Sequence, residues 1–198
     1  MIIPSQPTRS AALTQRGLRL EYATLGWNVV GCWIVLISAY RARSVALAGF
    51  GIDSVIEIFA SVVVVWQLKS INKEKEPLAE RLIGVAFFLL AAYIAVQSTI
   101  VLLTGFHPGS STLGIVWLAL TCVAMLALAY GKGRTGNALG NPVLQKEAKV
   151  TVVDGLLAAA VLAGLVLDAA FGLWWADPLA AFVIVYYGLR EGIAAART

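Results

Sequence analysis

Four acidic residues fall within long apolar stretches of the sequence, where a charged carboxylate is costly. Asp53 and Glu57 lie in SVALAGFGIDSVIEIFAS, and Glu147 and Asp154 lie in QKEAKVTVVDGLLAAAVLAG. A carboxylate in such surroundings must hold a proton, pair with a cation or bind a metal ion, because its desolvation is otherwise uncompensated. These four residues are therefore the first candidates for a functional site.

The spacing of these acids places them on shared helical faces. Asp53 and Glu57 are four residues apart, which on a helix sets their side chains about 40° apart and one turn apart in height. Glu147 and Asp154 are seven residues apart, which is about 20° and two turns. Carboxylates crowded in a low dielectric cannot all stay ionised, so they hold protons or bind a cation. Oxygen ligands suit a hard or borderline divalent ion, and Zn²⁺ also accepts them.

Two of the polar candidates have a second interpretation. Glu147 is either a metal ligand or the partner of Lys149, which lies two residues further along the chain. Asn28 lies in the middle of the first apolar stretch, where its amide either supplies an accessory oxygen ligand or joins two helices by a hydrogen bond.

The other polar residues in or near the apolar stretches are expected to be peripheral. Glu21 and Asp168 lie near the ends of their stretches, so we expect both to face lipid headgroups or water. His107 is the single histidine and lies in the loop TGFHPGSS, where a solvated side chain is expected. Cys32 and Cys122 lie inside apolar segments and are interpreted as small packing residues.

Composition indicates the kind of protein that must position these acids. The chain has 198 residues, of which 60% are hydrophobic and 13% are charged. A soluble domain carries about 25% charged residues, so this chain has too little charge to cover a surface that faces water. We therefore interpret it as a membrane protein, which excludes a water-soluble enzyme, a disulfide-rich secreted module and a disordered regulator. At about 20 residues per crossing, the length allows about six spans.

The apolar pattern predicts an all-α, polytopic membrane protein with six transmembrane helices. Residues 1–19 are expected to form a cytoplasmic N-terminal tail and residues 20–195 the transmembrane domain, without a soluble C-terminal domain. Asn141-Pro142 and Asp177-Pro178 each combine a capping side chain with a proline that suits a first helical turn. The predicted helices are Leu20–Tyr40, Val45–Leu68, Glu80–Leu103, Leu113–Tyr130, Val143–Ala169 and Pro178–Ala194, with the fifth expected to begin near Pro142.

The basic residues predict the orientation. Thirteen of the 15 Lys and Arg residues, Lys132 among them, fall in the tail, the loops or the helix ends on one side of the predicted bundle, and only Arg41 and Arg43 fall on the other. The positive-inside rule then places both termini in the cytoplasm. The basic residues form no continuous stripe, so nucleic acid is not an expected partner. An intramembrane enzyme is disfavoured because no span pairs a Ser or Cys with a base and no HExxH motif occurs.

These features resemble the transmembrane part of the cation diffusion facilitator family of divalent-metal transporters, over about residues 18 to 196. The resemblance rests on the six spans, the short basic turn after the second, the acid pair in SVALAGFGIDSVIE, and KVTVVDG followed by WADPLAAFVIVYYGLREG. In that family, acidic or histidine positions on the second and fifth helices form a mid-membrane transport site, typically for Zn²⁺ and sometimes for Mn²⁺ or Fe²⁺. By position, Asp53 and Glu57 match the pair on the second helix, and Asp154 matches the last acid on the fifth.

The sequence departs from the family pattern in two places. Val150 stands four residues before Asp154, where the family has a His or Asp, and Glu147 is the candidate substitute. The chain ends at Thr198 after the sixth predicted helix, and the loop GKGRTGNALGNP carries no histidine. It therefore resembles a short form of the family, without the usual cytoplasmic metal-binding domain.

The resemblance implies a multi-pass protein of a bacterial-type plasma (inner) membrane that exports a divalent cation, with Zn²⁺ first, in exchange for protons. It also implies a homodimer. The ion is cargo, the protons are the counter-ion, and no prosthetic group is expected. The alternative is a membrane protein that binds metal without moving it, as a sensor or a partner subunit.

Overall fold

The computed structural model describes residues 6–69, 76–107, 109 and 111–196, and the fold is all-α, as the sequence predicts. Residues in six apolar stretches form helices because a backbone in lipid must satisfy its hydrogen bonds within its own segment. In chain order these helices are α1 (Gln6–Ala42), α2 (Val45–Lys69), α3 (Glu76–Thr104), α4 (Thr112–Leu139), α5 (Pro142–Phe171) and α6 (Ala176–Ala196).

All six helices extend beyond their predicted bounds, α1 and α4 by the most, whereas the start of α5 near Pro142 is confirmed. Helix α1 begins at Gln6, so residues 6–19 of the expected tail are helical, and α4 continues to Leu139 instead of ending at Tyr130. The side chain of Asn141 accepts a hydrogen bond from the backbone N–H of Leu144 and caps α5 at the predicted proline. Gly140 ends α4 with φ at 61°, a left-handed conformation that favours glycine.

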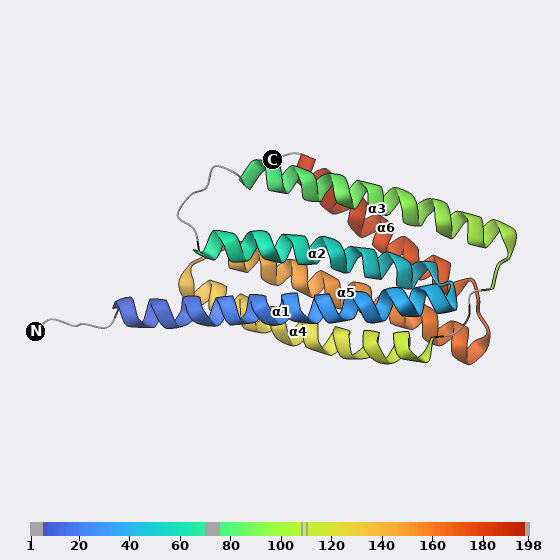
Figure 1. Ribbon diagram of the computed structural model, residues 1–198, viewed down its shortest axis with the longest axis horizontal. Coiled ribbons are helices and arrows are strands. Elements are labelled where there is room, and N and C mark those ends of the chain that lie inside the picture. The colour runs from blue at the N-terminus through green and yellow to red at the C-terminus, as the bar shows by residue number, and fades with distance from the viewer. Residues whose placement is uncertain (1–5, 70–75, 108, 110, 197–198) are drawn as a thin grey trace, which may run out of the picture.

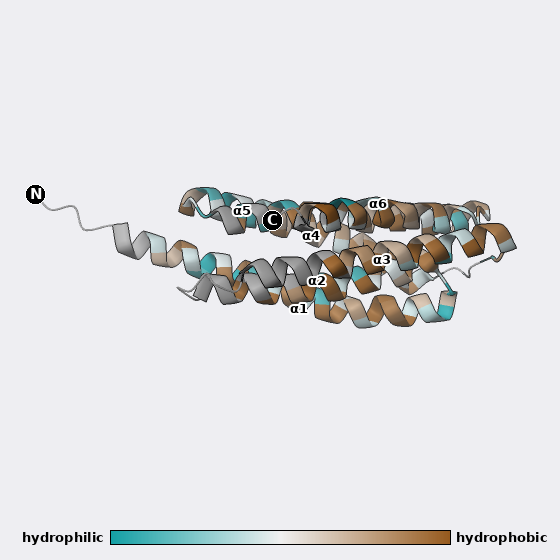
Figure 2. Cartoon of the chain, turned by 90° about the horizontal axis from the view of Figure 1, so that it is seen from above, coloured by the Kyte–Doolittle hydropathy of each residue, from teal (hydrophilic) through white to brown (hydrophobic). Residues whose placement is uncertain are grey.

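The helices form an elongated bundle in which α2 lies close to four others. The most extensive pairings are α4 with α5, α3 with α6 and α1 with α2, and α2 also contacts α3, α5 and α6. Figure 1 shows α1 and α5 running in the same direction and α2 and α4 running in the opposite one. Seen from above in Figure 2, α1, α2 and α3 lie on one side of the bundle and α5 and α6 on the other. This arrangement turns one face of α2 toward α5.

Glycines allow close contacts between helices. Helix α2 continues without interruption through Gly49 and Gly51. A Cβ on Gly51 would lie 2.6 Å from Cδ2 of Leu36, so the absence of a side chain lets α1 approach α2. A Cβ on Gly164 would lie 2.9 Å from the carbonyl oxygen of Ala176, at the contact of α5 with α6. Small residues at such contacts are typical of helix pairs in membranes.

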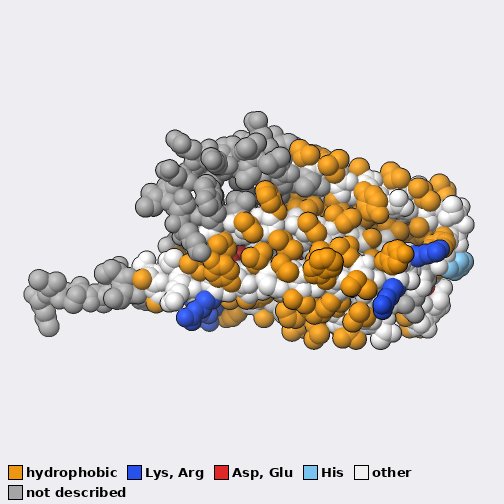
Figure 3. Space-filling view, in the orientation of Figure 1, with side chains coloured by type: hydrophobic (Ala, Val, Ile, Leu, Met, Phe, Trp, Pro, Cys, Tyr) orange, Lys and Arg blue, Asp and Glu red, His pale blue; other side chains and the backbone are white. Residues whose placement is uncertain are grey.

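The outward surface of the bundle is apolar. Large side chains such as Trp33, Leu103 and Val123 are about 70–80% exposed, at 69%, 82% and 70%. Figure 3 shows hydrophobic side chains over most of the visible face and Lys and Arg near its two ends. A continuous apolar surface of this kind suits lipid and not water. Among the described residues, four segments are long and apolar enough to cross a membrane, namely Ser10–Ala42, Phe87–Thr104, Thr112–Leu139 and Glu147–Phe171.

A buried polar contact joins α2 to α6 at one end of the bundle. Ser44 caps α2 by accepting a hydrogen bond from the backbone N–H of Leu47, and its hydroxyl donates to Oδ1 of Asp177 in the first turn of α6. The other oxygen of Asp177, Oδ2, is buried and accepts no hydrogen bond within the described residues. A residue of α6 thereby holds the side chain that caps the first turn of α2.

Candidate metal centre

Three of the four predicted acids form one buried cluster. Asp53 and Glu57 project from α2, and Asp154 projects from α5 to meet them. One oxygen from each carboxylate lies within 4.8 Å of the other two, and all three residues are buried. The three are therefore close enough to share a single cation, as the family resemblance implied for residues on the second and fifth helices.

The cluster contains oxygens that lack a protein partner. Both side-chain oxygens of Asp53 and Oδ2 of Asp154 are buried and accept no hydrogen bond within the described part of the chain. Buried polar atoms are almost always hydrogen-bonded, so an unpartnered carboxylate oxygen calls for an explanation. The donor set of three carboxylates fits a divalent cation, whose charge would compensate the crowding of like charges.

Asn28 is the polar contact of this cluster from α1. Its Nδ2 donates a hydrogen bond of 2.9 Å to Oε2 of Glu57, and the residue is 3% exposed. The contact joins α1 to α2 and fixes one oxygen of Glu57. Asn28 acts here as a donor, and ligation of a metal by its amide oxygen stays a prediction.

Glu147 lies apart from the three carboxylates. It is buried, and its Oε1 accepts a charge-assisted hydrogen bond of 3.3 Å from Nζ of Lys132 on α4. The alternative partner, Lys149, is exposed, so the predicted pairing of Glu147 with Lys149 is wrong. The reason is helical geometry, because two residues of separation turn the helix by about 200° and place Lys149 on the opposite face.

Sequence reasoning missed the residue that neutralises Glu147. Lys132 was placed in a loop, but α4 continues past it, and its side chain is fully buried between Glu21 and Glu147. Nζ of Lys132 lies 3.1 Å from Oε2 of Glu21, and Glu21 is also fully buried, so the expectation that Glu21 faces headgroups or water is wrong. We call Glu21, Lys132 and Glu147, with Thr151, the lysine cluster.

The burial of Lys132 fits the spacing of the buried residues along α4, a pattern that the structure shows and the sequence does not. Buried residues recur every three or four positions along this helix, and Lys132 continues their series. A stripe with that spacing faces the interior of a bundle. The series runs Gly114, Leu118, Thr121, Met125, Ala129, Lys132, Gly136.

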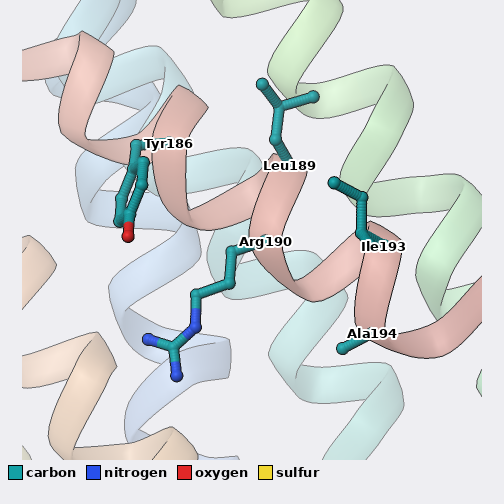
Figure 4. A pocket seen from close by; sticks show the side chains of 5 residues that line it. All are labelled: Tyr186, Leu189, Arg190, Ile193 and Ala194. Atoms are coloured by element: carbon teal, nitrogen blue, oxygen red, sulfur yellow. The ribbon is translucent and has the colours of Figure 1, made fainter.

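The remaining predicted positions lie away from both clusters. His107 is exposed, as predicted, and its ring lies against Trp174 with centroids 4.9 Å apart. Cys32 and Cys122 are free and half-buried. An open pocket on the outside of α6 is lined by its own side chains, including Arg190 and Tyr186, as Figure 4 shows. This pocket contains no acid and does not reach the carboxylates.

A comparison with protein families decides the assignment. The cation efflux transmembrane domain matches residues 22–198. The chain belongs to the cation efflux family. No curated protein matches it. The match covers all three carboxylates, the lysine cluster except Glu21, and all of α2 to α6.

Family membership agrees with the resemblance found in the sequence. The protein is a multi-pass integral membrane protein of a transporter family, and it is not an enzyme. Val150, at the position where the family resemblance implies a His or Asp ligand, is half-buried and has no ligating atom. The cation efflux protein therefore presents a donor set made only of oxygen in the described cluster.

Proposed function

We propose that this cation efflux protein transports a divalent metal ion, with Asp53, Glu57 and Asp154 as its ligands. The observation that carries the proposal is the buried meeting of these three carboxylates, with unpartnered oxygens on Asp53 and Asp154. Neither of the ion pairs found among the described residues includes a member of this cluster. A metal ion supplies the positive charge that the neighbouring side chains do not.

The transport cycle follows from competition between metal and protons. Only a carboxylate, and not a carboxylic acid, ligates the ion, so metal binding releases protons and acidification weakens binding. On the side where the ion is taken up, the carboxylates lose protons and bind it. On the other side, protons return and the ion leaves. The net process is metal/proton antiport by alternating access, with Zn²⁺ as the first candidate and Mn²⁺ or Fe²⁺ as the others.

The proposal includes six spans with both termini in the cytoplasm of a bacterial-type plasma membrane. Within the described part of the chain, four helical segments are long and apolar enough to span, and α2 and α6 pack against them in the bundle. Cysteines introduced singly at positions in the loops test this topology, because a membrane-impermeant thiol reagent labels only those on the accessible side. The homodimer is tested by mass measurement of the purified protein in detergent.

Flux in proteoliposomes tests the transport proposal. Wild type should take up Zn²⁺ into the liposomes in exchange for protons that flow outward. Asp53→Ala and Asp154→Ala should reduce this uptake to that of empty liposomes. Ser38→Ala is the matched control, because its hydroxyl donates to the carbonyl of Ile34 in its own helix. Equal flux in wild type and both Ala variants would remove these residues from the pathway. Metal binding without flux would support the sensor or partner subunit instead.

Competition among ions identifies the cargo. Purified protein is loaded with Zn²⁺, Mn²⁺, Fe²⁺, Co²⁺ and Ni²⁺ together, and the bound and transported ions are measured by mass spectrometry. A site made only of oxygen is less selective for Zn²⁺ than one with a histidine. Preference for Mn²⁺ would therefore agree with the carboxylate ligands and correct the identity of the cargo.

A further inference from the structure

The lysine cluster has oxygen atoms that could ligate a cation, and the ammonium of Lys132 already lies among them. The ammonium of Lys132 is fully buried and donates hydrogen bonds to three oxygens, which are Oε2 of Glu21 at 3.1 Å, Oε1 of Glu147 at 3.3 Å and Oγ1 of Thr151 at 3.1 Å. These groups come from α1, α4 and α5, so the contact is made by three helices and not by one local turn.

One oxygen of this cluster is left without a partner. Oε1 of Glu21 is buried and accepts no hydrogen bond within the described residues, although the other oxygen of the same carboxylate binds Lys132. The ammonium therefore does not satisfy all the acceptors around it. A divalent ion that coordinates both oxygens of Glu21 would satisfy this one as well.

The lysine cluster lies in line with the three carboxylates. Glu21 comes seven residues before Asn28 on α1, and Glu147 comes seven residues before Asp154 on α5, which is about 10 Å along each helix. Because α1 and α5 run in the same direction, both acids are displaced toward the same end of the bundle (Figure 1). By the orientation predicted from the basic residues, this end faces the cytoplasm. Helix α2 runs the other way, so Glu57 lies between Asp53 and this end.

We propose that Glu21, Glu147 and Thr151 form a second cation site between the cytoplasmic end and the three carboxylates, and that the Lys132 ammonium fills it in this conformation. A divalent ion entering from the cytoplasm displaces the ammonium, is held by the same oxygens and moves on to the deeper ligands. When the ion leaves, Lys132 returns. The site's place on a transport path rests on the proposed function, whereas its ability to bind a cation does not.

Metal stoichiometry tests the site directly. Wild type, Lys132→Gln and Lys132→Met are purified in detergent with Zn²⁺ present, and bound Zn²⁺ is measured by equilibrium dialysis, with Mn²⁺ in a parallel set. We expect each Lys132 variant to bind one more ion per chain than wild type. The double variant Lys132→Gln/Glu21→Gln should lose this gain. Lys149→Met, which removes an exposed lysine from α5, should bind as wild type does.

A further pair of variants separates this proposal from the transport site. Asp154→Asn should bind one ion fewer than wild type, and Lys132→Gln/Asp154→Asn should keep the gained ion. If Asp154→Asn binds as wild type, the three-carboxylate site fails while the gain still reports on the lysine cluster. No gain in either Lys132 variant, or a gain that survives Glu21→Gln, would overturn the second site. Lys132 variants that stay unfolded at every metal concentration would overturn it too, because the ion would then not replace the ammonium.

Discussion

Two clusters of buried acids follow one another along the bundle, with Glu147 about 10 Å from Asp154 along α5, and within the described residues only one of them contains a cation. Glu21 and Glu147 share the ammonium of Lys132, whereas Asp53, Glu57 and Asp154 have Asn28 as a neutral donor. In both clusters, burial in a low dielectric makes the negative charge of the carboxylates costly. In the cluster with its own cation, part of the negative charge is compensated in the absence of metal. The cluster without a cation needs protons or an ion from outside.

The largest effect is expected when a lysine is introduced beside the three carboxylates. Asn28→Lys places an ammonium beside Glu57, because Oε2 of Glu57 lies 2.9 Å from Nδ2 of Asn28. We expect loss of metal binding at the three carboxylates and flux at the background level, because the tethered cation occupies the place of the ion. Retained Zn²⁺ flux would contradict the carboxylate site.

Removing the lysine from the other cluster should have the next largest effect. In the absence of metal, Lys132→Met leaves two buried carboxylates without their cation, which costs about 3–5 kcal/mol when one partner of a buried pair is removed. Thermal unfolding in detergent, followed by tryptophan fluorescence in the presence of a chelator, measures the loss. A midpoint equal to that of wild type would show that Lys132 does not neutralise these acids.

A smaller effect is expected when Asn28 is replaced by an apolar residue of similar size. Asn28→Leu removes the hydrogen bond to Glu57 without adding a charge, and loss of such a supporting contact to a metal ligand lowers affinity by about 10–100-fold. Calorimetric titration with Zn²⁺ measures this change. An unchanged affinity would show that the amide joins helices without influencing the site, and a total loss would make Asn28 a ligand.

The smallest effect is expected at the lysine that the sequence paired with Glu147. Lys149 is exposed, so Lys149→Met should change the free energy of unfolding by no more than about 0.5 kcal/mol and leave metal binding as it is. The comparison with Lys132→Met in the same unfolding assay separates the buried lysine from the exposed one. A larger loss at Lys149 than at Lys132 would reverse the assignment of the partner.

The sequence singles out Asp53, Glu57 and Asp154 as candidates because that signal is local, whereas the meeting of the second and fifth helices was implied by the family resemblance. An acid in an apolar run stands out, and spacings of four and seven residues translate directly into shared helical faces. The start of α5 is equally local, since Asn141 and Pro142 are a cap and a first turn. The all-α fold and the number of helices follow from the apolar runs for the same reason.

The lysine cluster is harder to predict because its members come from three helices. Lys132 stands in GKGRTG, where the glycines suggest a loop. In the structure these glycines are helix contacts: a Cβ on Gly131 would lie 3.1 Å from Leu20, and one on Gly136 would lie 3.0 Å from the backbone nitrogen of Gln145. Glycine occurs both in turns and at close helix contacts, and the sequence alone does not distinguish the two. Only the position of the neighbouring helix does.

The contact of Ser44 with Asp177 bears on how the bundle assembles. The two residues are 133 positions apart, and Asp177 lies in the last helix of the bundle. During synthesis the hydroxyl of Ser44 can therefore reach its partner on α6 only when nearly the whole chain has been made. The acids that we propose as ligands come together one helix earlier, when α5 joins α2. In biogenesis the candidate metal centre can thus form first, and the contact of Ser44 with Asp177 forms last.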